Sequence, residues 1–253
     1  MANTTVLITG ANRGLGRALT TRYLARPATT VIAAVRDPSH PTAQSLASLP
    51  LGADGSALIT VKIEATSDTD AAAAVALLQR DHGITKLDVV VANAGFGTVY
   101  GDLSQAKIDD VRELYDINAI GPLRLFQAVR PLLEAEGTER PRFVLIGTPI
   151  ASIGAMEKSP FPMLAYGMSK AAAHYMTRKV HCESERLTAF VVDPGFAQTD
   201  MGNTGARYFG YEQAFVPVDV SGDFLFGTIE KATREEAGGK FLTISEGEDF
   251  IDW

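Results

Sequence analysis

The sequence predicts an α/β fold in which strands and helices alternate, and three observations support it. Short apolar runs rich in branched residues alternate with runs of helical periodicity along the 253 residues. A glycine-rich turn joins the first apolar run to the first helical run. The other candidate motifs follow later apolar runs, at the edge where a parallel sheet gathers its ligand-binding loops. The predicted architecture is therefore one Rossmann-like, doubly wound parallel sheet of about seven strands, with helices on both faces.

The predicted strands are continuous apolar runs that are too short to form helices. They cover Thr5–Thr9, Thr30–Val35, Ala57–Ile63, Leu87–Ala92, Arg142–Gly147, Thr188–Val192 and Lys240–Ser245. Helical patterns lie near residues 15–26, 67–82, 104–136 and 164–185. Residues 37–56 are rich in Pro, Ser and Gly, so we expect a surface loop with little regular structure there. Residues 1–253 are expected to form one domain, because a layered α/β fold can use this length as a unit.

The composition argues against several classes of partner. The formal net charge is −7, from 23 basic and 30 acidic residues, so we expect no surface for nucleic acid or an anionic membrane. The only cysteine is Cys182, and no run approaches the ~18 apolar residues of a membrane span. The first residues do not resemble a signal peptide, and we expect a soluble, cytoplasmic protein. The histidines lack metal-ligand spacing, so no metal is expected, and His174 is assigned to a helix surface or an interface.

The glycine-rich turn has the context of a dinucleotide-binding site. It runs from Thr9 to Gly16, after the apolar run Val6–Ile8 and before a segment with apolar residues at helical spacing. Glycines let a pyrophosphate approach the backbone closely, and a helix N-terminus offers free N–H groups to its charge. The spacing is G-x-x-x-G-x-G rather than G-x-G-x-x-G, so a loop without a ligand stays an alternative. The candidate contacts in the turn are Gly10, Asn12, Arg13, Gly14, Leu15 and Gly16.

A second candidate site is the pair formed by Tyr166 and Lys170, which precedes a run of alanines. Residues four apart lie on one face of a helix, one turn from each other. A lysine ammonium beside a phenol lowers the pKa of the phenol, and such a phenol can act as the acid in a carbonyl reduction. The pair alone is a weak signal, because this spacing occurs by chance on many helices.

Together these motifs resemble those of the short-chain dehydrogenase/reductase family, over essentially the whole chain. Three further motifs keep the family's order: Asn93-Ala94-Gly95 after a strand, Asn118 on a helix, and Asp193-Pro194-Gly195 followed by Thr199. Within the family the chain is similar to fungal reductases of the norsolorinic-acid ketoreductase type, notably in residues 31–37, 87–95 and 198–203. The resemblance implies a reductase of fungal secondary metabolism that transfers a hydride from NADPH to the carbonyl group of a bulky aromatic or polycyclic ketone.

The form of the cofactor depends on the residues at the end of the second predicted strand, Val35-Arg36-Asp37. An acid there would accept a ribose 2′-hydroxyl, whereas an arginine would pair with a 2′-phosphate. In the family, basic residues at the positions of Arg36 and Arg13 imply NADP(H), and Asp37 is expected to point to solvent. Glu64, where the family commonly has an aspartate, either contacts the adenine or is exposed. The other cofactor contacts that the resemblance implies are Asn93, Ala94, Gly95, Tyr166, Lys170, Pro194, Gly195 and Thr199.

The resemblance also assigns catalytic roles. It implies that Tyr166 donates the proton, that Lys170 lowers the pKa of Tyr166 and binds ribose hydroxyls, and that Asn118 holds a water in a proton relay. Without the family, Asn118 would be interpreted as a residue that caps or kinks a helix. The family usually has two serines where this sequence has Gly147-Thr148, so Thr148 is the predicted hydroxyl that orients the carbonyl oxygen. Ser152 is the alternative orienting residue, but its hydroxyl could reach the carbonyl oxygen only if the loop folds back.

The altered serine position leaves other functions open. One is a protein of this fold that uses bound NADPH for imine reduction or for a stereocontrolled cyclisation. Another is a nucleotide sensor without catalysis, which would normally have lost Tyr166 or Lys170. The family commonly self-associates through two long helices, here near 104–136 and 164–185, so we expect a homodimer or homotetramer. In the family, residues 201–222 cap the substrate pocket, and we expect mobility there.

Overall fold

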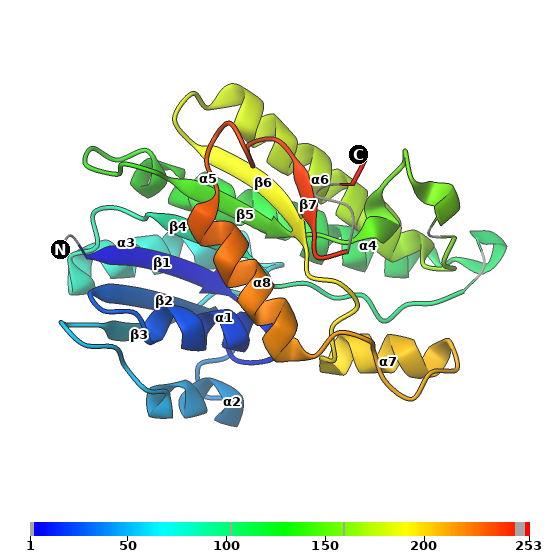
Figure 1. The fold of residues 1–253 in the computed structure, drawn as a ribbon, viewed down its shortest axis with the longest axis horizontal. Coiled ribbons are helices and arrows are strands. Elements are labelled where there is room, and N and C mark those ends of the chain that lie inside the picture. Colours follow the sequence, from blue (N-terminus) through cyan, green and yellow to red (C-terminus); the bar gives the residue numbers. More distant parts are fainter. Residues whose placement is uncertain (1–2, 102, 159, 246–250) are drawn as a thin grey trace.

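A seven-stranded parallel sheet forms the centre of the computed structural model, which describes residues 3–101, 103–158, 160–245 and 251–253 (Figure 1). The strand order is β3-β2-β1-β4-β5-β6-β7, and every pair of neighbours is parallel. The strands are β1 (Thr4–Thr9), β2 (Thr29–Val35), β3 (Ala57–Lys62), β4 (Val89–Ala92), β5 (Arg142–Ile146), β6 (Thr188–Asp193) and β7 (Phe241–Thr243). The strand order reverses between β1 and β4, which is where such sheets bind ligands. The predicted fold class is confirmed.

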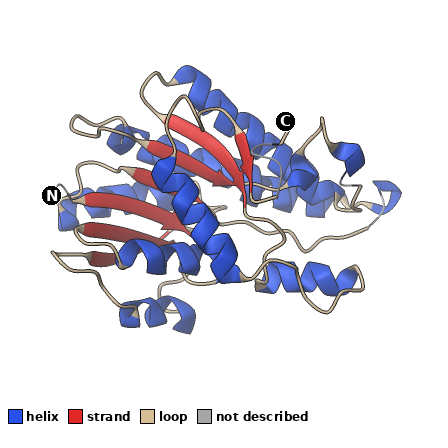
Figure 2. Cartoon of the chain, viewed as in Figure 1, coloured by secondary structure: helices blue, strands red, loops and turns tan. Residues whose placement is uncertain are grey.

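Helices cover both faces of the sheet (Figure 2). Side chains of α1 (Gly14–Leu24) and α8 (Val218–Lys231) share one core cluster with alternate residues of the strands. Side chains of α3 (Asp70–His82), α5 (Gly121–Leu133) and α6 (Leu164–Glu183) share the other. Because successive strand residues point to opposite faces, the two clusters lie on opposite sides of the sheet. The remaining α-helices are α2 (Pro41–Gln44), α4 (Ile108–Tyr115) and α7 (Asp200–Tyr208).

The structure corrects three expectations about helices. The helix predicted near 104–136 is continuous over residues 108–133, but a π-helical turn at Asp116–Ile120 interrupts its α-helical geometry between α4 and α5. Residues 37–56 contain α2 and a 3-10 turn, since the His40 side chain caps the Thr42 N–H and a proline occupies the first helical position. The helix α8 was not predicted, because its two glycines and its serine obscure the apolar pattern. All seven observed strands overlap their predicted ranges.

The described residues include no helix that is long and apolar enough to cross a membrane. They also include no group of three or more His, Cys, Asp or Glu side chains arranged to hold a metal ion.

Candidate active site

The helix α6 begins at the centre of the site and carries both Tyr166 and Lys170. The Lys170 Nζ lies 6.0 Å from the centroid of the Tyr166 ring and donates a hydrogen bond to the Ile146 carbonyl oxygen at 2.9 Å. Ile146 is the last residue of β5, so the end of this strand fixes the lysine. The side chain is 5% exposed, and burial lowers the pKa of Lys170 to about 8.

The structure raises the pKa of Tyr166, whereas the sequence predicted that Lys170 would lower it. Burial is the largest cause, and the carboxylate of Asp193 adds to it. The hydrogen bond with Thr148 opposes them, because it stabilises the phenolate. The phenol therefore keeps its proton at neutral pH in this state of the protein.

The structure brings Thr148, and not Ser152, to Tyr166. The Thr148 side chain lies close enough to the Tyr166 phenol to lower its pKa, and it accepts from the Ile150 N–H at 3.4 Å, at the start of a 3-10 turn. Ser152 is 1% exposed and donates to the Asp252 carbonyl oxygen at 2.6 Å. It also accepts from the Ala155 N–H at 2.9 Å. Ser152 is thus committed to structural bonds, and the orienting hydroxyl that the geometry favours is Thr148.

Asn118 lies in the π-helical turn and is fully buried. Its Oδ1 accepts from the Phe96 N–H at 2.9 Å, and its Nδ2 donates to the Phe96 carbonyl oxygen at 2.7 Å and to the Ser169 Oγ at 3.0 Å. Ser169 in turn donates to the Tyr166 carbonyl oxygen at 2.8 Å. The Asn118 side chain therefore ties the loop after β4 to the helix that carries Tyr166. Both of its amide hydrogens have protein acceptors, and its role in a water relay stays a prediction.

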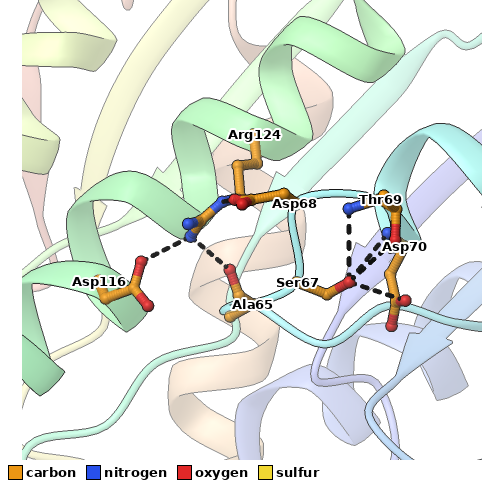
Figure 3. A network of polar contacts seen from close by, with 7 residues as sticks. All are labelled: Ala65, Ser67, Asp68, Thr69, Asp70, Asp116 and Arg124. Carbon is orange, nitrogen blue, oxygen red and sulfur yellow. Dashed lines mark hydrogen bonds and ion pairs between the residues drawn. The ribbon is translucent and has the colours of Figure 1, made fainter.

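A network around Arg124 holds the π-helical turn in place (Figure 3). Its guanidinium donates to Asp116 at 2.7 Å, to Asp68 at 2.6 Å and to the Ala65 carbonyl oxygen at 3.1 Å. Asp116 is the first residue of the π turn, and Ala65 follows Glu64 after β3. One side chain of α5 thus joins the turn that carries Asn118 to the loop that carries Glu64.

The glycine-rich turn is built for a close approach of backbone groups. Gly10 and Gly14 have φ of +63° and +51°, and a Cβ on Gly16 would lie 2.2 Å from the Gly10 carbonyl oxygen. Asn93 Nδ2 donates to the Thr9 carbonyl oxygen at 2.8 Å, which fastens the turn to the end of β4. The Thr9 hydroxyl also accepts from the N–H groups of Asn93 and Ala94, both at 3.0 Å. No side chain caps the N-terminus of α1 among the described residues, so its N–H groups can serve an anion.

A cavity of about 380 Å³ lies along α1 from Gly14 to Arg22, where this helix faces residues 198–200 and the start of α8 at Val218. The Thr199 hydroxyl accepts from the Gly202 N–H at 3.1 Å and so caps α7. Gly195 has φ of +75°, and its N–H donates to Asp193 Oδ1 at 3.0 Å. Gly14 and Thr199 thus both line this cavity, and the uncapped N–H groups at the start of α1 fit the phosphates of a dinucleotide.

The two arginines proposed for the 2′-phosphate have separate partners. Arg36 Nε lies 3.8 Å from Glu64, and Arg13 lies 4.0 Å from Asp200. Both guanidinium groups are mostly exposed, with 78% and 69% of the side chain accessible. They are therefore within reach of a ligand, although the structure does not join them to a common group. Nearby, Asn12 donates to the Thr42 hydroxyl at 2.6 Å, Leu15 packs against the core, and the exposed Asp37 bonds to Ser39.

Sequence reasoning missed several residues of the site. A Cβ on Gly97 would lie 2.6 Å from the Tyr166 ring, so this glycine permits the ring position. The rings of Tyr100 and Tyr208 stack at 4.3 Å, between the loop after β4 and α7. His174 is 2% exposed and is packed against Phe241, so its predicted place on a helix surface is wrong. Among the residues that were missed, only Ser169 could have been identified from the sequence, since it directly precedes Lys170 in the motif.

Comparison with known proteins agrees with this geometry. The chain is 46% identical to a norsolorinic acid ketoreductase of Dothistroma septosporum over 245 residues, which cover 96% of this chain and 91% of the relative. It is 43% identical to the norsolorinic acid ketoreductase of Aspergillus parasiticus, covering 96% and 89%. The NADPH-bound carbonyl reductase from chicken fatty liver matches with a TM-score of 0.83 at 26% identity, covering 100% of both chains. The family model described as short chain dehydrogenase matches residues 4–207, and the chain belongs to this family of oxidoreductases.

Proposed function

We propose that this oxidoreductase is an NADPH-dependent ketoreductase for a bulky, planar aromatic or polycyclic ketone, with Tyr166 as the proton donor. The observation that carries the proposal is that Thr148 lies close enough to the Tyr166 phenol to lower its pKa, with the buried Lys170 one helical turn away. Two hydroxyl groups that meet beside a buried ammonium form a site for a carbonyl oxygen that becomes an alkoxide.

Three observations support NADP(H) as the cofactor. The cavity bordered by Gly14 and Thr199 offers a free helix N-terminus to the phosphates. Arg36 and Arg13 carry exposed guanidinium groups, which can exchange their carboxylate partners for a 2′-phosphate. The structural neighbour from chicken is an NADPH-bound carbonyl reductase. When bound, the cofactor supplies the hydride that reaches the carbonyl carbon.

The residues of the chain supply the proton and the orientation. Thr148 donates to the carbonyl oxygen of the ketone and holds it against the phenol. Tyr166 gives its proton to the oxygen as negative charge develops there, and its raised pKa keeps that proton available until then. Lys170, held by the Ile146 carbonyl oxygen, stabilises the phenolate that remains. Asn118 and Ser169 keep the loop and the helix in register through their hydrogen bonds.

The aromatic rings at the mouth of the site support a planar substrate. Tyr100 and Tyr208 stack at 4.3 Å with an interplanar angle of 17°, and Phe209 packs against Tyr100 and against Phe161. Tyr100 lies close enough to Tyr166 to influence its pKa. Aromatic surfaces favour stacking with flat ligands. The two relatives named norsolorinic acid ketoreductase also support a ketone of this class and a place in fungal secondary metabolism.

The test is NADPH consumption by the purified protein with a panel of aromatic, polycyclic and aliphatic ketones. We expect turnover with NADPH, little with NADH, and the best rates with flat polycyclic ketones. Tyr166→Phe should abolish turnover and keep NADPH affinity, whereas Arg36→Ala should weaken NADPH and leave NADH unchanged. If Tyr166→Phe were as active as the parent protein, the proposed role of the phenol would be contradicted. Absence of turnover with every ketone would contradict the assignment as a reductase.

The proposal extends to the organisation of the protein. Residues 1–253 form one cytoplasmic domain, which self-associates through the helical segment α4–α5 and through α6. Exposed apolar side chains support this, namely Ile108 and Tyr115 on α4 and Met168 and Tyr175 on α6. Light scattering on the purified protein would detect a dimer or a tetramer, and a monomer at micromolar concentration would contradict this part.

A further inference from the structure

Residues 251–253, which we call the clamp segment, hold the loop that follows Thr148. The Asp252 carbonyl oxygen accepts from the Ser152 hydroxyl at 2.6 Å. The Trp253 carbonyl oxygen accepts from the Gly154 N–H at 2.8 Å. Within the described parts of the chain, the other hydrogen bonds of residues 149–155 close turns inside the same loop. The clamp segment is therefore the main polar anchor of this loop.

The clamp segment is itself anchored to the sheet and to α6. The Ile251 N–H donates to the Phe241 carbonyl oxygen in β7 at 2.7 Å. The Trp253 ring lies 6.0 Å from the His174 ring, edge to face, and 5.2 Å from the Arg178 guanidinium. Both residues belong to α6, and Figure 1 shows this end of the chain beside that helix. The segment thus joins β7, α6 and the loop after Thr148.

His174 marks the point where the segment meets the catalytic helix. It lies one turn beyond Lys170, on the same helix face as Tyr166. It is 2% exposed, and neither ring nitrogen has a hydrogen-bond partner among the described residues. An unpaired buried polar group of this kind costs free energy, so the packing around it must offset that cost. The rings of Trp253 and Phe241 supply that packing, with Phe241 at 4.6 Å from His174.

We propose that Trp253 is a positioning residue: through the clamp segment, it holds the loop after β5 so that the Thr148 hydroxyl meets Tyr166. This inference rests on the proposed role of Thr148. The loop connects the end of β5 to the start of α6, so movement at Ser152 and Gly154 changes the approach of Thr148. Loss of the clamp lowers turnover and leaves the glycine-rich turn at Gly10–Gly16 unchanged, so NADPH binding is retained.

Trp253→Ala and Trp253→Phe test the proposal, with kcat measured at saturating NADPH and the NADPH dissociation constant measured separately. We expect Trp253→Ala to lower kcat by about tenfold to 100-fold, because a misplacement of a reacting group by up to about 1 Å costs as much as 10²-fold. NADPH affinity should stay at the parental value, and Trp253→Phe should recover most of the activity. The matched control is Phe226→Ala on α8, since Phe226 also has an edge-to-face partner in Tyr23 and an arginine 6.0 Å from its ring. The Phe226→Ala substitution should lower the melting temperature and leave kcat unchanged.

Ser152→Ala provides an independent readout, because it removes one bond of the clamp and keeps Trp253, the only tryptophan. We expect lower kcat together with stronger iodide quenching of tryptophan fluorescence. Parental kcat in Trp253→Ala overturns the proposal, as does reduced kcat in Ser152→Ala with unchanged quenching. If Trp253→Ala does not fold, the kcat and quenching results for Ser152→Ala and the kcat of Trp253→Phe decide whether the proposal holds. Failure of the proposed function would appear separately, as turnover that survives in Tyr166→Phe.

Discussion

Gly97→Ala should displace the Tyr166 ring and lower turnover sharply. A Cβ at residue 97 would lie 2.6 Å from Cε2 and 2.7 Å from Cδ2 of the Tyr166 ring. Carbon atoms in ordinary contact are about 3.5–4.0 Å apart, so the ring or the loop must move by roughly 1 Å. The loop is held on its other side by the two hydrogen bonds between Phe96 and Asn118, so the ring is the part that yields. Misplacement of a reacting group by about 1 Å costs on the order of 10²-fold in kcat.

The assay is steady-state NADPH consumption with the best ketone substrate, together with NADPH binding and a thermal melt. We expect kcat to fall about 100-fold in Gly97→Ala while NADPH affinity is retained. Gly227→Ala is the matched control, because a Cβ there meets no atom within 4 Å. That helical substitution should stabilise the protein by about 0.5–1 kcal/mol and leave kcat unchanged. Parental kcat in Gly97→Ala, with Tyr166→Phe inactive, would refute the reasoning.

Three further predictions concern stability. Asp193 is buried, and its pKa is raised from 3.8 to about 6. The stability that its protonated form contributes is therefore fully present below pH 3.8 and is lost as the pH rises through about 6. Asp193→Asn should therefore stabilise the protein at about pH 7 by up to about 3 kcal/mol and not at about pH 4; equal effects at both would contradict this. Burial lowers the pKa of His174 to about 3 from 6.5, so the parent loses stability as the pH falls below 6.5. His174→Leu should flatten the melting temperature in that range, and an unchanged pH profile would count against the assignment. Arg124→Ala should lower the free energy of unfolding by about 2 kcal/mol in urea, since it leaves Asp116 without its cation; no change would show that the network is dispensable.

The sequence predicted the sheet well, because each strand is a continuous apolar run that is buried on both faces. It also predicted which candidate residues lie together at the strand ends, since their positions depend on the order of elements alone. The π-helical turn at Asp116–Ile120 could not be found in this way, because it depends on Arg124 and on the tertiary contacts of Asn118. The direction of the pKa shift of Tyr166 was wrong for a similar reason. Spacing on a helix places Lys170 nearby, but it gives neither the burial of the phenol nor the carboxylate of Asp193.

The charges around Tyr166 bear on the direction of the reaction. Burial lowers the pKa of Lys170 to about 8 and raises that of Tyr166, so at neutral pH the phenol is protonated. A protonated phenol is the acid that ketone reduction needs, whereas alcohol oxidation needs the phenolate as a base. Asp193, close to the phenol, adds negative charge and disfavours the phenolate further. The hydrogen bond from Thr148 is the contact that opposes both effects, so the hydroxyl that orients the ketone also limits how far the phenol departs from its working range. Burial and the carboxylate therefore keep on the phenol the proton that the proposed carbonyl reduction needs, and Thr148 moderates their effect.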